Sequence, residues 1–174
     1  MSDQYPANPY GQQQPAPTGP GGEPPLWAPY YGISFPKAFS RFFKKYVRFD
    51  GRASRSEYWW WYLWSAIIGT AGAIITGILT AATGTTTTTS SSSYVGVSTM
   101  STNPVAGVPI WIIGLALIIP TLALIVRRLH DANLSGLLAL LLLVPFLGPI
   151  AVFVMMFLPS DPAGSRFDRP DGAR

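Results

Sequence analysis

The sequence predicts an all-α membrane protein with about three transmembrane helices, an N-terminal interfacial amphipathic helix and a disordered N-terminal tail. Apolar residues make up 48% of the 174 residues and charged residues only 11%, less than half of the usual share in soluble domains. Asp, Glu, Lys and Arg are absent from two long stretches, 58–126 and 132–160, of 69 and 29 residues. A soluble fold of this size could not keep so much uncharged chain in solution.

Residues 1–33 are rich in Pro, Gln and Gly, and we expect them to form a disordered tail because they cannot bury a core. This tail has no apolar segment of the kind found in cleavable signal peptides. The first span is therefore expected to act as the insertion signal. A solvated spacer is the favoured interpretation of the tail, and a docking strip for a module that binds polyproline II is the alternative.

Residues Phe35 to Phe49 predict a helix that lies on the membrane surface. Aromatic side chains recur at three- and four-residue spacing, and Pro36 suits the first turn. The basic positions suit a surface of anionic lipid; they are Lys37, Arg41, Lys44, Lys45 and Arg48. Nucleic-acid binding is the competing interpretation. It is disfavoured because a membrane span follows about ten residues later.

Three stretches within a helical membrane domain, 34–160, are long enough to cross about 30 Å of hydrocarbon as helices. They cover about 58–79, 105–126 and 134–158. The first is preceded by Ser54 and Glu57 at the spacing of a capping box and opens with a belt of aromatic residues. Gly69, Ala73 and Gly77 recur every four residues, which would let another helix approach closely.

The other two spans contain prolines. Pro120 should kink the second span. The third contains Pro145 and Pro149, and a single kinked helix is favoured over a re-entrant hairpin. Residues 80–104 predict a low-complexity, flexible outer loop with nine consecutive Thr and Ser residues, for which a glycan acceptor is the alternative; residues 161–174 form a short C-terminal tail.

The distribution of basic residues predicts the orientation. Seven basic and two acidic residues lie between Lys37 and Glu57, and Arg127 and Arg128 follow the second span, whereas the loop after the first span is uncharged. The N-terminus is therefore expected in the cytoplasm and the loop outside. Three full crossings would then leave the C-terminus outside.

Two polar motifs are expected at the same depth, on the cytoplasmic face. Gly51–Glu57 precedes the first span and Arg127–Asp131 follows the second. We expect them to form one charged cluster of Arg52, Arg55, Glu57, Arg127, Arg128, His130 and Asp131. Arginine forks there would suit phospholipid headgroups or another anionic ligand. The favoured interpretation of Arg127–Asp131 is a simple membrane anchor, in which the two arginines fix the orientation and Asp131 or Asn133 caps the third span.

Several kinds of chemistry are disfavoured. The chain has no Cys and one His, which excludes disulfides, thiol catalysis and multi-His metal sites, so no metal or cofactor is expected. His130 and Asp131 could form an acid–base pair, but no convincing nucleophile accompanies them. The predicted spans carry no ionisable group in their interior, which argues against a proton-coupled transporter.

The segment Phe49–Trp59 followed by Arg127–Asp131 resembles the YhaH-like bacterial inner-membrane proteins, family 805 of the domains of unknown function. The resemblance covers about residues 35–170. It implies a small multi-pass protein of the bacterial inner membrane. It supplies no established activity, cofactor or catalytic residue.

These observations together favour a non-enzymatic membrane adaptor or envelope-associated factor of the bacterial cytoplasmic membrane. The expected partners are the bilayer with its anionic headgroups and a second copy or another membrane protein, but no nucleic acid. A component of a small oligomeric channel or transporter is the alternative. A third hypothesis is a lipid-modifying enzyme that uses His130 and Asp131.

Overall fold

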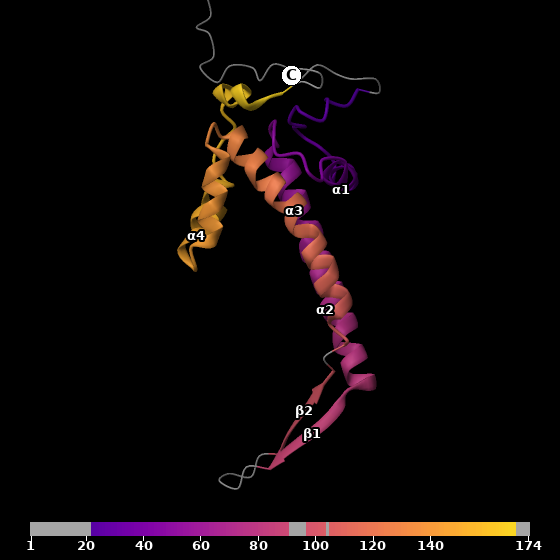
Figure 1. The fold of residues 1–174 in the computed structure, drawn as a ribbon. Coiled ribbons are helices and arrows are strands. Elements are labelled where there is room, and N and C mark those ends of the chain that lie inside the picture. Colours follow the sequence, from indigo (N-terminus) through magenta and orange to yellow (C-terminus); the bar gives the residue numbers. More distant parts are fainter. Residues whose placement is uncertain (1–21, 91–96, 104, 170–174) are drawn as a thin grey trace, which may run out of the picture.

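The computed structural model describes residues 22–90, 97–103 and 105–169. Two long antiparallel helices, α2 (Arg55–Thr83) and α3 (Val108–Asp131), contact each other and form the long axis of the molecule (Figure 1). Both are long and apolar enough to cross a membrane. The sequence predicted both of these helices, at 58–79 and 105–126.

The start of α2 follows from a local signal. Ser54 Oγ accepts a hydrogen bond from the Glu57 backbone N–H, and the Glu57 carboxylate accepts one from the Ser54 N–H, at 3.2 and 2.9 Å. The predicted capping box is therefore confirmed, and it satisfies two of the backbone donors that a helix N-terminus leaves free.

The first helix, α1 (Phe35–Lys44), packs its aromatic face against the start of α2. Phe42 stacks on Trp61 and Phe35 on Trp64, with ring centroids 3.3 and 4.3 Å apart. The indole N–H of Trp64 donates to the Phe35 carbonyl at 3.0 Å. The aromatic side chains that predicted a membrane-surface helix thus attach α1 to α2, and the helix ends at Lys44 rather than Phe49.

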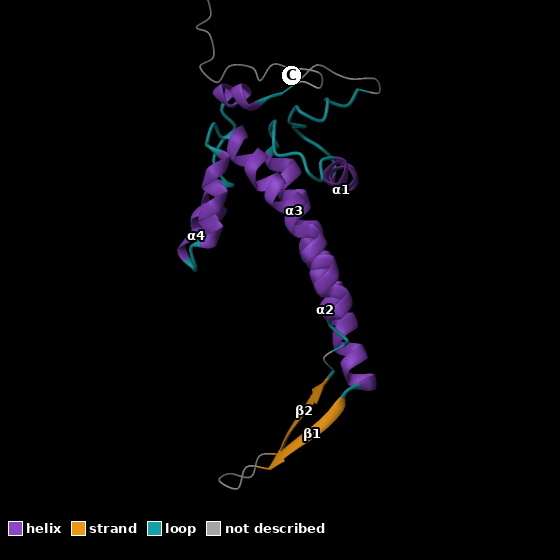
Figure 2. Cartoon of the chain, viewed as in Figure 1, coloured by secondary structure: helices purple, strands orange, loops and turns teal. Residues whose placement is uncertain are grey.

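The loop between α2 and α3 contains regular structure that the sequence did not predict. Strands β1 (Thr85–Ser90) and β2 (Val97–Thr102) pair antiparallel, from Thr85 opposite Thr102 to Ser90 opposite Val97. They extend beyond the far ends of the long helices (Figure 2). The β-branched threonines that looked like low complexity have a strand preference, which explains this ribbon.

Residues 134–158 do not form the single kinked helix that was favoured. They form a 3₁₀ helix, η1 (Gly136–Leu143), and a short α-helix, α4 (Leu147–Met155), which contact each other as a hairpin. Phe146 turns the chain with φ 63° and ψ −61°, and the Leu147 N–H donates to the Pro145 carbonyl at 2.7 Å in a γ-turn. At about 2.0 and 1.5 Å per residue, neither arm reaches across about 30 Å of hydrocarbon.

The hairpin of η1 and α4 brings the chain back to the end of the molecule where α1 lies. A final 3₁₀ helix, η2 (Pro162–Phe167), lies at the same end of the molecule as α1 (Figure 1). The Gly51 N–H donates to the Phe167 carbonyl at 2.9 Å. The two ends of the described chain therefore contact each other, which corrects the expectation of three crossings with the C-terminal segment on the opposite side.

The small-residue stripe on α2 does not pack within the chain. A Cβ built on Gly69 or Gly77 would meet no atom within 4 Å, and Ala73 is exposed. Instead Gly72 faces α3, where a Cβ would lie 2.4 Å from Ile110 Cδ1. The close approach of α2 and α3 therefore occurs at Gly72, on a different face of α2 from the predicted stripe.

The predicted tail is only partly covered, because residues 1–21 lie outside the described residues. Residues 22–33 pack on the protein, which corrects the expectation of disorder for them: Ala28 is 0% and Ile33 2% exposed. The indole N–H of Trp60 holds this segment by donating to the Ile33 carbonyl at 2.8 Å. Contacts with α2 thus order this segment, and its own composition does not reveal them.

Candidate functional site

Charged side chains gather at one end of the molecule, which we call the charged cap and define as residues 22–57, 127–133 and 158–169. Every Asp, Glu, Lys and Arg of the described residues lies in it. The buried apolar core lies beside it, where Phe42, Trp61, Leu124 and Met156 meet. The apolar core and the charged side chains therefore hold the same helices together.

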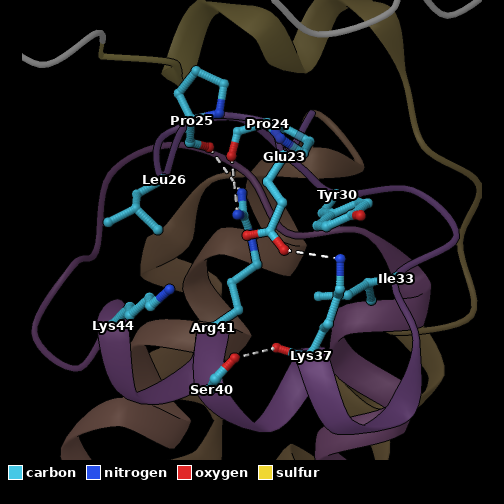
Figure 3. Close-up of a pocket in the computed structure, with 10 residues that line it drawn as sticks. All are labelled: Glu23, Pro24, Pro25, Leu26, Tyr30, Ile33, Lys37, Ser40, Arg41 and Lys44. Carbon is cyan, nitrogen blue, oxygen red and sulfur yellow. Dashed lines mark hydrogen bonds and ion pairs between the residues drawn. The ribbon is translucent and has the colours of Figure 1, made fainter. Parts of the chain in front are cut away.

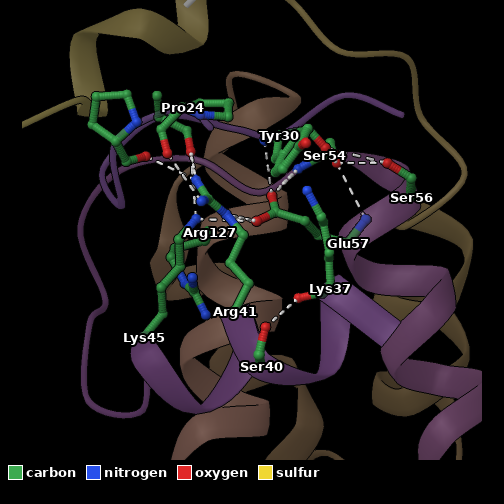
Figure 4. Close-up of polar contacts among 12 residues, drawn as sticks. Pro24, Tyr30, Lys37, Ser40, Arg41, Lys45, Ser54, Ser56, Glu57 and Arg127 are labelled. Atoms are coloured by element: carbon green, nitrogen blue, oxygen red, sulfur yellow. Dashed lines mark hydrogen bonds and ion pairs between the residues drawn. The ribbon is translucent and has the colours of Figure 1, made fainter. Parts of the chain in front are cut away.

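Glu57, in the first turn of α2, is the centre of the first cluster (Figure 4). Its Oε1 lies 2.7 Å from Arg41 Nε and 3.1 Å from Lys45 Nζ. Its Oε2 accepts hydrogen bonds from the backbone N–H groups of Ser54 and Tyr30, at 2.9 and 3.3 Å. The three ionised side chains are at most 6% exposed, so this is a buried ion-pair network.

Arg41 also attaches the N-terminal segment to the cap. Its two terminal nitrogens donate to the carbonyls of Pro24, Pro25 and Ala28 at 3.0, 2.8 and 2.9 Å. A pocket of about 220 Å³ lies between this segment and α1 (Figure 3). Lys37 and Glu23, which form an ion pair, both line it. The Arg41 guanidinium thus donates to the Glu57 carboxylate and to three backbone carbonyls.

Asp131, the last residue of α3, is the centre of the second cluster. Its Oδ2 pairs with Arg128 Nη1 at 3.0 Å and accepts a hydrogen bond from the Ser160 hydroxyl. Its Oδ1 accepts one from the Tyr31 hydroxyl at 2.9 Å. Burial and the neighbouring Asp131 carboxylate raise the pKa of Tyr31 above its usual value, so this phenol remains a donor. Arg128 also donates to the carbonyls of Met156 and Leu158.

The C-terminal segment docks on the remaining motif residues. Arg52 forms a fork with Asp168, with Nε–Oδ1 and Nη2–Oδ2 distances of 3.0 and 2.7 Å. His130 Nδ1 lies 3.1 Å from the Gly51 carbonyl, and its ring stacks on Phe167 with centroids 4.1 Å apart. These contacts join residues up to 116 positions apart in the sequence.

Metal binding finds no support in this geometry. Within residues 22–90, 97–103 and 105–169, no cluster of three His, Asp or Glu side chains is placed to hold a metal ion. His130 and Asp131 also bond in different directions, to Gly51 on one side and to Arg128, Tyr31 and Ser160 on the other. Their chain proximity therefore does not create an acid–base pair.

Comparison with known proteins decides the family. The model of the family described as "Protein of unknown function (DUF805)" matches residues 46–169, which include both polar motifs and the docked C-terminal segment. The chain belongs to the DUF805 family. The resemblance stated from the two motifs is confirmed.

Relatives of the chain bear the names of inner membrane proteins. The chain is 33% identical over 124 residues to the inner membrane protein YhaI of Escherichia coli K12, covering 71% of this chain and 86% of the relative. It is 31% identical over 124 residues to the inner membrane protein YhaH of the same strain, covering 71% and 87%. No solved structure matches the chain. The two candidate spans and these relatives agree on an inner-membrane protein.

The seven residues predicted as one charged cluster are divided in the structure. Glu57 forms ion pairs with Arg41 and Lys45 and lies beside Arg127, whereas Arg128 pairs with Asp131. Arg55 lies at the edge, where its Nε donates to the Leu158 carbonyl at 3.1 Å. The DUF805 match begins at residue 46, so both cations that pair with Glu57 precede it.

Two of the five residues expected on the membrane surface are buried. Arg41 is 5% and Lys45 1% exposed, because both turn toward Glu57. Lys44 is exposed, and Lys37 and Arg48 pair with Glu23 and Asp50. No local spacing in the sequence marks Tyr31, Ser160 and Asp168 as cap residues, because their partners lie far away along the DUF805 chain.

Proposed function

We propose that this protein is a two-span inner-membrane protein whose charged cap lies in the cytoplasm and serves as a non-enzymatic adaptor for another membrane or envelope protein. The observation that carries the proposal is that charged side chains of the cap bond to partners in other segments of the chain. Ion pairs join α1 to α2 and Arg52 to Asp168 of the C-terminal segment. Hydrogen bonds from Tyr31 and Ser160 to Asp131 attach the end of α3 to the segments that precede α1 and follow α4 in the chain. A rigid cap on two spans suits a docking platform.

The orientation rests on the charge of the cap. It contains eleven basic and six acidic side chains among the described residues, and the ribbon of β1 and β2 contains none. Basic segments near spans stay in the cytoplasm, so the cap is cytoplasmic and the ribbon faces outward. The hairpin of η1 and α4 is then re-entrant and the C-terminal segment is cytoplasmic.

Single-cysteine labelling tests this topology, since the natural chain has no Cys. Ser98→Cys in β2 should react with a membrane-impermeant thiol reagent on intact spheroplasts. Ser40→Cys in α1 and Ser165→Cys in η2, which are both exposed, should react only after permeabilisation. Labelling of Ser165→Cys from outside, with Ser40→Cys protected, would instead require three crossings.

The adaptor role is tested by crosslinking in living cells. A photo-crosslinking residue at Lys44 or Arg166, two exposed cap positions, should capture a specific protein, and the same probe at Thr99 in the ribbon should not. A chain without residues 1–21 shows whether the segment before the cap contributes to recruitment. Capture of lipid or of this protein alone at both cap positions would argue against an adaptor.

A second candidate function is a subunit of a small oligomeric channel. The observation that favours it is the outward-facing stripe of Gly69, Ala73 and Gly77, which no part of the chain covers among the described residues. Small residues of this kind let transmembrane helices approach closely. Self-crosslinks at this stripe together with solute flux through liposomes would support it. The lipid-modifying hypothesis is weaker, since His130 and Asp131 are held apart by their separate partners.

A further inference from the structure

Arg127 is a buried cation without a full set of partners. It lies in the last turns of α3 and is 1% exposed. Its Nε donates to the Ala123 carbonyl at 3.1 Å, but its Nη2 has no hydrogen-bond partner in the described part of the chain. A buried charged donor that lacks an acceptor keeps its full desolvation penalty. This nitrogen therefore needs an acceptor that the described side chains do not supply.

The charges around Arg127 point to the nature of that acceptor. Arg41, Lys45 and Arg127 surround Glu57, and the first two share its Oε1. One carboxylate cannot neutralise three cations, so the cluster has an excess of positive charge where no side chain is more than 6% exposed. Buried charges need compensation by opposite charge. A water molecule would accept a hydrogen bond but would leave this excess in place.

A small cavity lies at this position. It is lined by the apolar side chains Ala38, Phe42 and Leu124 and by four charged side chains, Arg41, Lys45, Glu57 and Arg127. Figure 4 shows how these four charged side chains lie. Its volume of about 10 Å³ suits an occupant about the size of one water molecule. A whole phosphate group is too large for it. The occupant that satisfies both charge and size is a single small anion.

We propose that this cavity is a binding site for one halide-sized inorganic anion, held by Arg127 Nη2 and Lys45 Nζ. The anion supplies the missing acceptor and reduces the charge excess. It also links two elements, because Lys45 is the C-cap residue of α1 and Arg127 lies in the last turns of α3. The bound anion therefore stabilises the cap whether or not the cap recruits another protein.

Anion binding is expected to depend on pH through Lys45. Burial lowers the pKa of Lys45 to about 7, with Arg127 and Arg41 acting in the same direction and Glu57 opposing them. A bound anion favours the protonated amine, so binding takes up a proton. The affinity should be about ten-fold higher at pH 6 than at pH 8, since the protonated fraction of Lys45 changes by about that factor.

The test measures melting of the purified full-length protein in detergent by tryptophan fluorescence. Sodium chloride is compared with sodium gluconate at equal ionic strength, at pH 6 and pH 8. The melting temperature should rise with chloride, because a ligand that binds only the folded state stabilises it, and it should rise more at pH 6. Arg127→Met should remove the chloride dependence, and Arg166→Met, at an exposed position, should keep it.

A second measurement decides the question if Arg127→Met does not fold. Line broadening of the ³⁵Cl resonance by the unmodified protein, reversed by bromide, would support the site. Equal melting in chloride and gluconate without line broadening would overturn it. Stabilisation by phosphatidylglycerol vesicles but by no halide would also overturn it and would assign the acceptor to a lipid phosphate oxygen.

Discussion

Glu57→Gln should lower the free energy of unfolding by about 3–5 kcal/mol, the usual effect of removing one partner from a buried ion pair. The carboxylate of Glu57 pairs with Arg41 and Lys45 while Arg127 lies beside it. The amide keeps an oxygen that can accept the Ser54 N–H, so the helix cap is largely preserved. The expected loss therefore comes from leaving three buried cations without their carboxylate.

Denaturant titration in detergent measures this effect, and Glu23→Gln is the matched control. Glu23 pairs with Lys37 at 3.0 Å, but the two side chains are 42% and 53% exposed. Exposed pairs contribute little to stability because water screens them, so Glu23→Gln should have a much smaller effect. Equal losses in the two variants would show that burial does not strengthen the Glu57 network.

Double-mutant cycles separate the pairing seen in the structure from the one that the sequence favoured. The two polar motifs led to the expectation that Glu57 and Arg128 are coupled. In the structure Glu57 pairs with Arg41, whereas Arg128 pairs with Asp131 at 3.0 Å. The cycle of Glu57 with Arg41 should therefore give a coupling energy of about 1–3 kcal/mol, and the cycle with Arg128 about 0.5 kcal/mol or less.

Local signals in the sequence were sufficient for the two long helices. The charge-free stretch 58–126 contains most of both α2 and α3, and the capping box of Ser54 and Glu57 marks where α2 begins. These features depend on neighbouring residues alone, so spacing and composition reveal them. In the structure the two polar motifs contact each other, where the Ala53 N–H donates to the Arg127 carbonyl at 3.0 Å.

The pairing within the cap could not be predicted in the same way. Tyr31 and Asp131 are 100 positions apart, and Arg52 and Asp168 are 116 apart. Which carboxylate a given arginine reaches depends on how the hairpin returns the chain. The basic residues of α1 led to a wrong expectation for a related reason. They have the spacing typical of a helix on a membrane surface, but Arg41 and Lys45 are buried against Glu57.

Gly148→Ala should destabilise the protein by about 2–3 kcal/mol, in the range of severe overpacking. A Cβ at this position would lie 1.7 Å from the carbonyl oxygen of Leu141 and 2.7 Å from its carbonyl carbon. Both are backbone atoms of the opposite arm, so no side-chain rotation relieves the clash. The arms η1 and α4 would have to separate, with a loss of packing around Val152 and Met156.

The sign of this effect also decides between a hairpin and a single kinked span, and denaturant titration in detergent measures it. In a continuous helix over 134–158, Gly148 would be an interior glycine, and alanine would stabilise it by about 0.5–1 kcal/mol. Gly77→Ala in α2 is the matched control, because its Cβ meets no atom within 4 Å, and it should stabilise the protein or leave it unchanged. Destabilisation by Gly148→Ala alone therefore requires the close approach of two antiparallel arms, whereas stabilisation by both substitutions would support a third membrane crossing.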